Sequence, residues 1–599
     1  MTLRALRIML ATGQSEREEL PAEVEQLYLG GRGAATWLLA TRVDLSTGPL
    51  SPANLLIFSA GPLTGATPVA TGGFIVTTRS PLTGAIAHSW GLGRWGAMLR
   101  RAGHDLLAIE GQSAEWCVLQ IDGPQVRVLP AEKLAGLDTA ATAQALRQQL
   151  GDDYVTLCVG PAGEAGVAYA SIVAEGIYPA EPAGTGAVMA HKRIKAIAVR
   201  GDARLSPVDG ARVDAVVVGI TRRISQSDVA AGIRQYGSLF YATQAADRGA
   251  LTGRNGQDSS PAYLPQISRV VLAQRGRREA RGCEGCPLPC HSVYVRKSGE
   301  PIAYPELEAV AGFGARCGVT NPDTLIITND LCIRLGLDVV ETSAALAFMM
   351  ECQQEGLTAG SLSWGDGEAM ISTIRRLAQR QEKRDILTLG VGEMQEVYWG
   401  SSAFAPQVKG MAMPALDPRA LHGVGLAMAS APIGGDYRYA MLYEELLQEP
   451  PPWLPDDPGH PQAIRGRVPR LIWYERFAAA IDAAGLCRRL ALLAFQVAPA
   501  EAAELLTAGV GRPHSVVEMA RLGERIVTLE RYASRRFTDA TDQLPKRWAT
   551  TPLPGGPAAG QPPPLAEMLA DYYRRHGWTE DGDPTPARLS ELGIQALNT

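Results

Sequence analysis

The chain has 599 residues, which is too many for one hydrophobic core, so about three or four domains are expected. Its 46% hydrophobic and 20% charged residues are typical of a globular protein, and its net charge of -5 gives no reason to expect a nucleic-acid or membrane partner. No apolar window of about eighteen residues occurs, and the few scattered cysteines favour a reducing, cytoplasmic compartment.

Short apolar runs separated by Gly and Pro turns indicate a β-rich region over residues 1–204. Residues 1–13 predict a strand ending in a turn and not a signal peptide, because Arg4 and Arg7 interrupt any apolar segment. Two helices are predicted here, at 22–42 and 140–150, and no tandem repeat of fixed period is visible. The further predicted strands are 55–58, 74–78, 105–109, 117–121 and 196–200.

From about residue 205 the apolar residues recur at three- and four-residue spacing, which predicts two mainly helical domains, 205–408 and 409–599. The fold class is therefore α+β, with the β-rich domain first. Pro-rich stretches at 448–461 and 552–564 predict a loop and an extended arm. The predicted helices before residue 408 are 213–227, 307–313, 322–335, 340–355, 367–382 and 390–399.

Three thiols stand in a Cys-x2-Cys-x3-Cys run, at Cys283, Cys286 and Cys290. The intervening Gly and Pro residues favour a fixed turn that directs the sulfurs toward one centre. Thiolates at this density suit zinc or an iron–sulfur cluster, and the sequence alone leaves both open. Three ligands complete neither site, so Cys487 is the candidate for the fourth. A disulfide framework is disfavoured, because nine is an odd number and the remaining cysteines are scattered.

Two stretches resemble each other, Gly336-Leu337-Asp338 and Gly485-Leu486-Cys487. Each follows a predicted helix, and a glycine there is most simply a left-handed helix cap. Finding two such stretches also suits a bipartite cofactor that needs matched anchors.

Glu308 stands where an apolar helix is predicted to begin. A carboxylate at that position is either a surface charge favoured by the helix dipole or a buried general acid/base with a raised pKa. The residues alone favour the surface charge.

Many short segments in one order resemble the aldehyde:ferredoxin oxidoreductase family of tungsten-pterin enzymes. The resemblance covers the chain almost end to end. The matching segments are 28–33, 49–58, 61–65, 80–84, 160–163, 184–189, 192–199, the cysteine run, 336–338, 482–487, 544–548 and 577–582.

This resemblance implies a [4Fe-4S] cluster on Cys283, Cys286, Cys290 and Cys487. It also implies two pterins that clasp tungsten, or molybdenum, with magnesium as an optional further ion. The pterin anchors would be Gly336, Leu337, Asp338, Asp482, Gly485 and Leu486.

The implied activity is two-electron oxidation of a small aldehyde-type substrate to a carboxylic acid. Electrons would pass through the cluster to ferredoxin or an iron–sulfur partner subunit, in a homo- or hetero-oligomer. Glu308 falls on the position of a carboxylate near the metal, where it would move protons. The resemblance therefore favours the general acid/base role of this residue.

The sequence departs from the family pattern around the pterins. Ile333 replaces an acidic or amide residue, Phe74 replaces an arginine, and Pro182 and Ala183 occupy the place of another arginine. Tyr437, a candidate catalytic residue, and Tyr439 stand where relatives have His and Lys; tyrosine donates a proton but offers no cation.

Two hypotheses follow from these departures. Either the enzyme holds the same cofactor through altered contacts, or the chain is a paralogue with a weakened or empty pterin site that serves electron transfer or assembly. Outside the family, the alternative is a zinc-stabilised scaffold.

Overall fold

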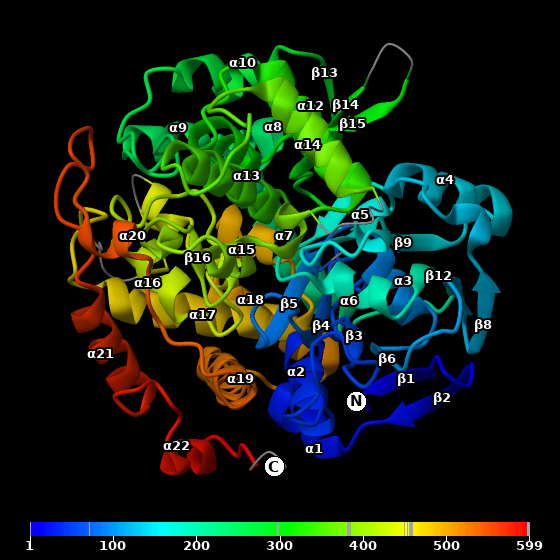
Figure 1. The fold of residues 1–599 in the computed structure, drawn as a ribbon. Helices are drawn as coiled ribbons and strands as arrows, with labels where there is room; N and C mark the ends of the chain where they lie inside the picture. The colour runs from blue at the N-terminus through cyan, green and yellow to red at the C-terminus, as the bar shows by residue number, and fades with distance from the viewer. Residues whose placement is uncertain are drawn as a thin grey trace.

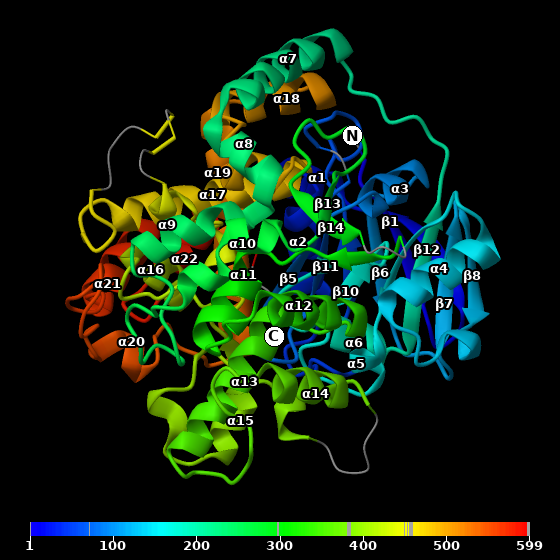
Figure 2. The same cartoon turned by 90° about the horizontal axis from the view of Figure 1, so that it is seen from above.

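The structure is a computed structural model that describes residues 2–70, 72–295, 299–379, 385–447, 450–451, 453–454 and 459–595. The first third of the chain is β-rich and lies on one side of the molecule, while the helical remainder packs against it (Figure 1). Figure 2 shows the same division from above. The α+β fold class predicted from the sequence is therefore confirmed, and the boundaries at 204 and 408 stay predictions.

The β-rich region contains two six-stranded sheets. Along the first sheet the strand order is β2-β1-β6-β3-β4-β5, and along the second it is β11-β10-β9-β12-β7-β8. The strands of the first sheet are β1 (Arg4–Met9), β2 (Gln14–Glu19), β3 (Leu56–Ser59), β4 (Phe74–Arg79), β5 (Ile86–Gly91) and β6 (Leu106–Glu110). Those of the second sheet are β7 (Cys117–Asp122), β8 (Gln125–Pro130), β9 (Val155–Val159), β10 (Ile172–Ala174), β11 (Tyr178–Ala180) and β12 (Ile194–Arg200).

The two sheets have the same topology. When the strands of each sheet are numbered from its own first strand, both orders become 5-4-3-6-1-2. The pairing directions match as well: the first and sixth strands are parallel in each sheet, and every other pair is antiparallel. The sequence therefore has no repeat of fixed residue spacing, as expected, but the fold does repeat. A duplicated sheet can keep its strand order while the lengths between its strands change.

The two sheets share one hydrophobic core, which strand alternation explains. On β6, Leu107 and Ile109 point into the shared core, while Leu106 and Ala108 point to the other face. Two helices contribute to the shared core, α3 (Trp95–Arg101) and α6 (Thr185–His191). The other helices of this region are α1 (Ala22–Tyr28), α2 (Gly31–Arg42), α4 (Thr139–Leu150) and α5 (Pro161–Glu164).

The rest of the chain is mainly helical, as predicted. Its longer helices are α7 (Gly210–Gln226), α8 (Asp228–Tyr236), α12 (Pro322–Leu335), α13 (Val339–Gln354), α14 (Gly367–Leu377), α16 (His422–Ser430), α17 (Arg467–Ala484), α18 (Pro499–Val510), α19 (Val516–Phe537) and α21 (Leu565–His576). The shorter ones are α9 (Ala242–Asp247), α10 (Arg269–Ala273), α11 (Leu307–Ala309), α15 (Val391–Val397), α20 (Lys546–Thr550) and α22 (Pro586–Glu591).

Two sheets in the helical part were not predicted: a two-stranded one, β16 (Gln407–Val408) with β17 (Met411–Ala412), and a larger one. The larger sheet has three antiparallel strands, β13 (Arg277–Arg281), β14 (His291–Val295) and β15 (Pro301–Ala303), and the cysteine run is the loop between the first two. The sequence of β13, Arg-Arg-Glu-Ala-Arg, shows no apolar alternation, so the usual strand signal is missing.

Two predictions fall partly on residues that are not described. They are the loop at 448–461 and the last residues of the helix expected at 367–382. In the described part of the chain, no helix combines the length and the apolar character needed to cross a membrane.

Candidate functional site

A cavity lies where the two sheets meet at their fifth strands. The N–H of Trp90, on β5, donates to the carbonyl of Glu181, directly after β11, at 3.0 Å. The helical part closes the cavity with Glu308, Arg438 and the segment 485–489. Segments between Ser59 and Leu493, far apart in the sequence, therefore meet at one place.

Two glycine contacts join the sheets to the helices that border this cavity. Gly485 ends α17 and Gly336 ends α12, each in the left-handed conformation with φ of 78° and 71°. A Cβ on Gly61 would lie 2.1 Å from the Gly485 nitrogen, and a Cβ on Gly160 would lie 2.2 Å from the Leu335 carbonyl oxygen. Both predicted helix caps are thus confirmed, and each one packs on a Gly-Pro turn that follows the third strand of its sheet.

The two predicted anchors differ in how directly they border the cavity. Gly485 and Leu486 line the cavity, as does Asp482. On the other side the lining residues are Ile333 and Val339, which flank the predicted anchor Gly336-Leu337-Asp338. Their roles in holding a cofactor stay predictions.

Asp482 is held by positive and hydrogen-bonding groups. Its Oδ2 accepts hydrogen bonds from Arg32 Nη1 at 3.2 Å and from Trp90 Nε1 at 3.0 Å. The guanidinium of Arg32 also makes two bonds of 2.8 Å to Glu530, on α19. Burial opposes the charge of Glu530, but Arg32 and then His88 outweigh it and hold the pKa of Glu530 below its ordinary value. We refer to Arg32, Glu530 and Asp482 as the Asp482 cluster.

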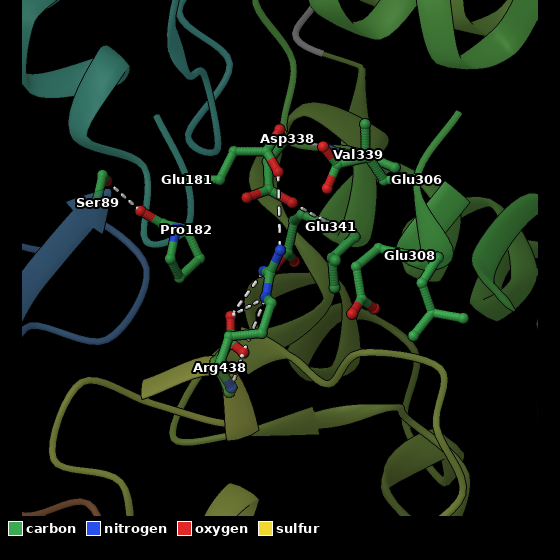
Figure 3. A network of polar contacts seen from close by, with 12 residues as sticks. Ser89, Glu181, Pro182, Glu306, Glu308, Asp338, Val339, Glu341 and Arg438 are labelled. Atoms are coloured by element: carbon green, nitrogen blue, oxygen red, sulfur yellow. Dashed lines mark hydrogen bonds and ion pairs between the residues drawn. The ribbon is translucent and has the colours of Figure 1, made fainter. Parts of the chain in front are cut away.

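Asp338 lies in a different electrostatic setting. Its Oδ1 caps α13 by accepting from the N–H of Glu341 at 2.8 Å, and Glu181 accepts from the N–H of Val339 at 3.3 Å. Figure 3 shows the Arg438 side chain extending toward these two carboxylates; its Nη1 lies 3.9 Å from Glu181 Oε2. Burial raises the pKa of both acids, and repulsion from Asp338 raises that of Glu181 further. We refer to Glu181, Asp338 and Arg438 as the Asp338 cluster.

Glu308 is buried, with 8% of its surface exposed, so the prediction of a surface charge is wrong. The short helix α11 continues directly into a π-helical turn, Val310–Arg316, and this helix runs through the interior. The hydroxyl of Tyr437 donates to Glu308 Oε1 at 2.6 Å, while Oε2 has no partner among the described residues. Burial raises the pKa of Glu308, and Arg438 partly offsets that rise.

The four predicted thiols occupy one neighbourhood. Cys283 and Cys487 line the same cavity, although they are far apart in sequence. Burial raises the pKa of Cys487 to about 11, and the nearby Cys283 adds to the rise. Likewise burial and the neighbouring thiols Cys487 and Cys290 raise the pKa of Cys286.

Four thiols match the donor set of a four-iron cluster, in which each iron takes one cysteine. Four cysteine thiolates are also the donor set of a structural zinc ion, so the thiols are compatible with either group.

Several residues that line the cavity have no role predicted from the sequence. Arg489 makes two bonds of 2.8 Å to Glu306, whose Oε1 also lies 3.1 Å from His291 Nδ1. Arg438 and Arg488 line the cavity as well. The position of Arg488 and Arg489 directly after Cys487 is the sequence feature that could have identified these two as site residues. These three arginines partly offset the cation that Phe74, which also lines the cavity, does not supply.

Comparisons with known proteins agree with this arrangement. Residues 5–201 match the sequence profile described as "Aldehyde ferredoxin oxidoreductase, N-terminal domain", and residues 215–594 match the profile for "domains 2 & 3" of the same enzyme. The chain belongs to the aldehyde ferredoxin oxidoreductase family. The resemblance inferred from the sequence motifs is therefore confirmed, and the family is one of oxidoreductases.

Individual relatives extend over the whole chain. A tungsten-containing aldehyde ferredoxin oxidoreductase of Pyrococcus furiosus is 32% identical over 604 residues, covering 99% of this chain and 98% of the relative. A protein of the same description from Thermococcus kodakarensis is 33% identical with the same coverage.

A more distant relative from Pyrococcus furiosus, described as the WOR-like subunit of an aliphatic sulfonate oxidoreductase, is 24% identical over 640 residues; it covers 99% of this chain and 96% of the relative. The solved structure of the BamBC active-site complex of benzoyl coenzyme A reductase, with 1,5-dienoyl-CoA, is 23% identical. Its TM-score is 0.84, with 99% of this chain and 98% of that chain covered. At this level of identity the likeness shows a shared fold.

Proposed function

We propose that the protein oxidises an aldehyde-type substrate to a carboxylic acid with a tungsten or molybdenum bis-pterin and a [4Fe-4S] cluster. The overall change adds the oxygen of one water to the aldehyde and releases two protons and two electrons. The observation that carries the proposal is the buried Glu308, which lines the same cavity as Cys283 and Cys487 and whose Oε2 has no partner among the described residues.

The donor sets support this assignment. Cys283, Cys286, Cys290 and Cys487 would hold the cluster, and the two Gly-Leu caps with Asp338 and Asp482 would hold the two pterins. When bound, the metal centre would supply the two-electron redox chemistry and the cluster would pass single electrons onward. Magnesium, the optional ion, gains no support from the described residues, among which no group of three or more His, Cys, Asp or Glu is placed to hold a metal ion.

The chain's own residues would manage the protons. Burial raises the pKa of Glu308, so its carboxylate is a stronger base than an exposed one and can accept a proton at Oε2. Tyr437 fixes the other oxygen with its 2.6 Å hydrogen bond, and burial keeps this hydroxyl neutral by raising its pKa well above 10. Glu308 is therefore the proposed general base, and Tyr437 is the residue that orients it.

The released electrons would pass to ferredoxin or to an iron–sulfur partner subunit, alone or within an oligomer. The family description and the named relatives support a ferredoxin-type acceptor.

The test of the assignment is metal analysis of protein purified without oxygen, together with activity on a panel of aldehydes. About four irons and about one tungsten or molybdenum per chain are expected, with reduction of a viologen dye. Glu308→Gln is expected to lower kcat by about 10²- to 10⁴-fold while iron and tungsten contents stay at wild-type values. Tyr437→Phe is expected to lower it less, since the carboxylate remains. Wild-type kcat in Glu308→Gln would contradict the proposed base.

A second candidate function rests on Phe74 and Glu181, which present an apolar ring and an acid to the cavity. Neither side chain can bind a phosphate, so the chain could be a paralogue with a weakened pterin site that transfers electrons or aids assembly. Iron without tungsten or molybdenum in the purified protein, and no aldehyde activity, would favour this function. A colourless, iron-free protein would instead favour a zinc scaffold.

A further inference from the structure

The loop that carries three of the cysteines is preceded by a strongly basic segment. Residues 275–281 contain four arginines and one glutamate, whereas the whole chain has a net charge of -5. The loop itself reaches the surface, because Gly282, Glu284 and Gly285 are exposed. Positive charge is thus concentrated where the predicted cluster site approaches solvent.

Arginines from two further elements join this segment. Arg101, at the end of α3, pairs with Glu284 at 3.1 Å, and Arg234, on α8, donates to the carbonyl of Pro287 at 3.4 Å. Arg278 in turn donates to the carbonyl of Arg234 at 2.6 Å, which ties α8 to β13. Figure 2 shows α8 beside this strand. Segments that are remote in sequence therefore surround one loop with positive charge.

The balance of charge at this rim is positive. Five arginines form it, Arg101, Arg234, Arg277, Arg278 and Arg281. Two acids lie among them: Glu284 pairs with Arg101, and Glu279 lies 3.3 Å from Arg281. Arg234 and Arg277 are exposed. We call these five arginines the cysteine-loop rim.

We propose that the cysteine-loop rim is the docking surface for a small acidic iron–sulfur electron carrier. The inference rests on the proposed function, because it needs electrons that leave through the cluster. A surface of one sign attracts a carrier of the other sign and raises the rate of encounter by about 10- to 10³-fold at low salt. Docking at this place puts the carrier against the exposed loop that holds three of the predicted cluster ligands.

An alternative role for the same arginines is to balance the negative charge of the thiolates and so set the potential of the cluster. The two roles differ in one respect. A change of potential acts in the same direction on every acceptor, whereas docking by charge acts in opposite directions on acidic and basic acceptors.

The experiment uses the full-length holoprotein with its cluster reduced by dithionite, so that no substrate is needed. The reduced protein is mixed in a stopped-flow instrument with an acidic bacterial ferredoxin, with basic mitochondrial cytochrome c, or with a neutral quinone dye. The rim variant is Arg234→Glu/Arg277→Glu. The matched control is Arg574→Glu, a charge reversal at a surface arginine of α21 whose side chain is 71% exposed.

For the rim variant, the second-order rate constant with ferredoxin is expected to fall by about 10- to 100-fold. The rate with cytochrome c is expected to rise, and the rates with the dye and in Arg574→Glu to stay unchanged. Equal rates with ferredoxin in wild type and rim variant, or shifts of the same sign with ferredoxin and cytochrome c, would overturn the proposal.

Salt dependence of the unmodified protein gives an independent measurement if the variant loses its cluster. Between about 0.01 and 0.5 M salt the rate with ferredoxin should fall steeply and the rate with cytochrome c should rise. A flat salt profile with ferredoxin would overturn the proposal. Failure of the proposed function would show itself separately, as absent tungsten and molybdenum or absent aldehyde oxidation, while the docking rates remained measurable.

Discussion

The two sides of the cavity have the same backbone plan and opposite electrostatics. On both sides, a Gly-Pro turn after the third strand of a sheet packs against the left-handed glycine that ends a helix, Gly61 on Gly485 and Gly160 on Gly336. The Asp482 cluster, however, balances its acids with a fully buried arginine, while the Asp338 cluster crowds Glu181 against Asp338 with one arginine nearby.

This difference shows that a duplicated backbone constrains the glycine contacts but not the ionisable side chains. Contact between backbones leaves no room for a side chain, so both sides keep glycine at the same places. Charge can be rearranged without moving the backbone, so the two sides differ most in their ionisable residues. Five substitutions test this division, from the largest expected effect to the smallest.

The largest effect is expected from Arg32→Met, which removes the cation of the Asp482 cluster. Glu530 then stays buried with only His88 and two hydroxyl donors as partners, and losing its guanidinium costs about 3 to 5 kcal/mol of unfolding free energy. Chemical denaturation followed by circular dichroism measures it. Arg42→Met is the control on the same helix, because Arg42 pairs with Glu18 near the surface and should cost less than about 1 kcal/mol. Equal losses in both variants would show that the Asp482 cluster is not held by charge.

Gly61→Ala and Gly160→Ala test the shared backbone plan. A new Cβ would stand 2.1 Å and 2.2 Å from backbone atoms of the facing segment, so each variant should lose about 3 kcal/mol, and to a similar degree. Thermal unfolding gives the comparison. Gly219→Ala, in the middle of α7 with open space around it, should instead be neutral or stabilising by up to about 1 kcal/mol. If only one of the two cavity variants were destabilised, the two sides would not share a contact plan.

Glu475→Gln tests whether the Asp482 side of the cavity also contains an acid whose ionised form destabilises the folded protein. Glu475 lies on α17 with Asp482 and accepts from the hydroxyl of Tyr572 at 2.8 Å, and burial raises its pKa from 4.5 to about 8. Between those pH values the folded protein binds more protons than the unfolded chain, so stability falls as the pH rises.

The glutamine variant should therefore be more stable than wild type by about 2 kcal/mol at pH 9 and nearly equal to it at pH 4. Denaturation across this pH range measures both. A stability difference that did not grow with pH would contradict the raised pKa of Glu475.

The smallest effect is expected from Glu181→Gln in the Asp338 cluster. Burial and Asp338 raise the pKa of Glu181, so removing its ionisable group should stabilise the protein by about 1 kcal/mol above pH 7. The amide oxygen can still accept from Val339. Melting temperatures at pH 6 and pH 9 provide the test, and a loss of stability at pH 9 would show that Glu181 is instead held as a charged partner of Arg438.

The sequence predicted the framework better than the charges. The β-rich first third, the helices and the two glycine caps follow from period, turn residues and spacing, which act locally. The duplicated sheet topology did not follow, because hydrogen-bonded strand order is a long-range property. Strand β13 was missed for a local reason, since a charged surface strand carries no apolar alternation.

Within the site, residue type predicted the thiols, but burial was needed for the acids. The local sequence does not reveal whether the helix that begins near Glu308 is exposed or buried. Only the folded structure shows that Glu308 is buried. Arg438 and Glu181 face each other only in the folded chain, so no motif could have paired them.

The contact between Arg32 and Glu530 spans 498 residues. At about 5 to 20 residues per second, a ribosome needs about 25 to 100 s to deliver the glutamate after the arginine has emerged. During that time Arg32 lacks Glu530, and Asp482, its other acidic partner, also follows it by 450 residues. Completion of the cavity therefore coincides with the end of translation, and a cofactor can be enclosed only by a finished chain.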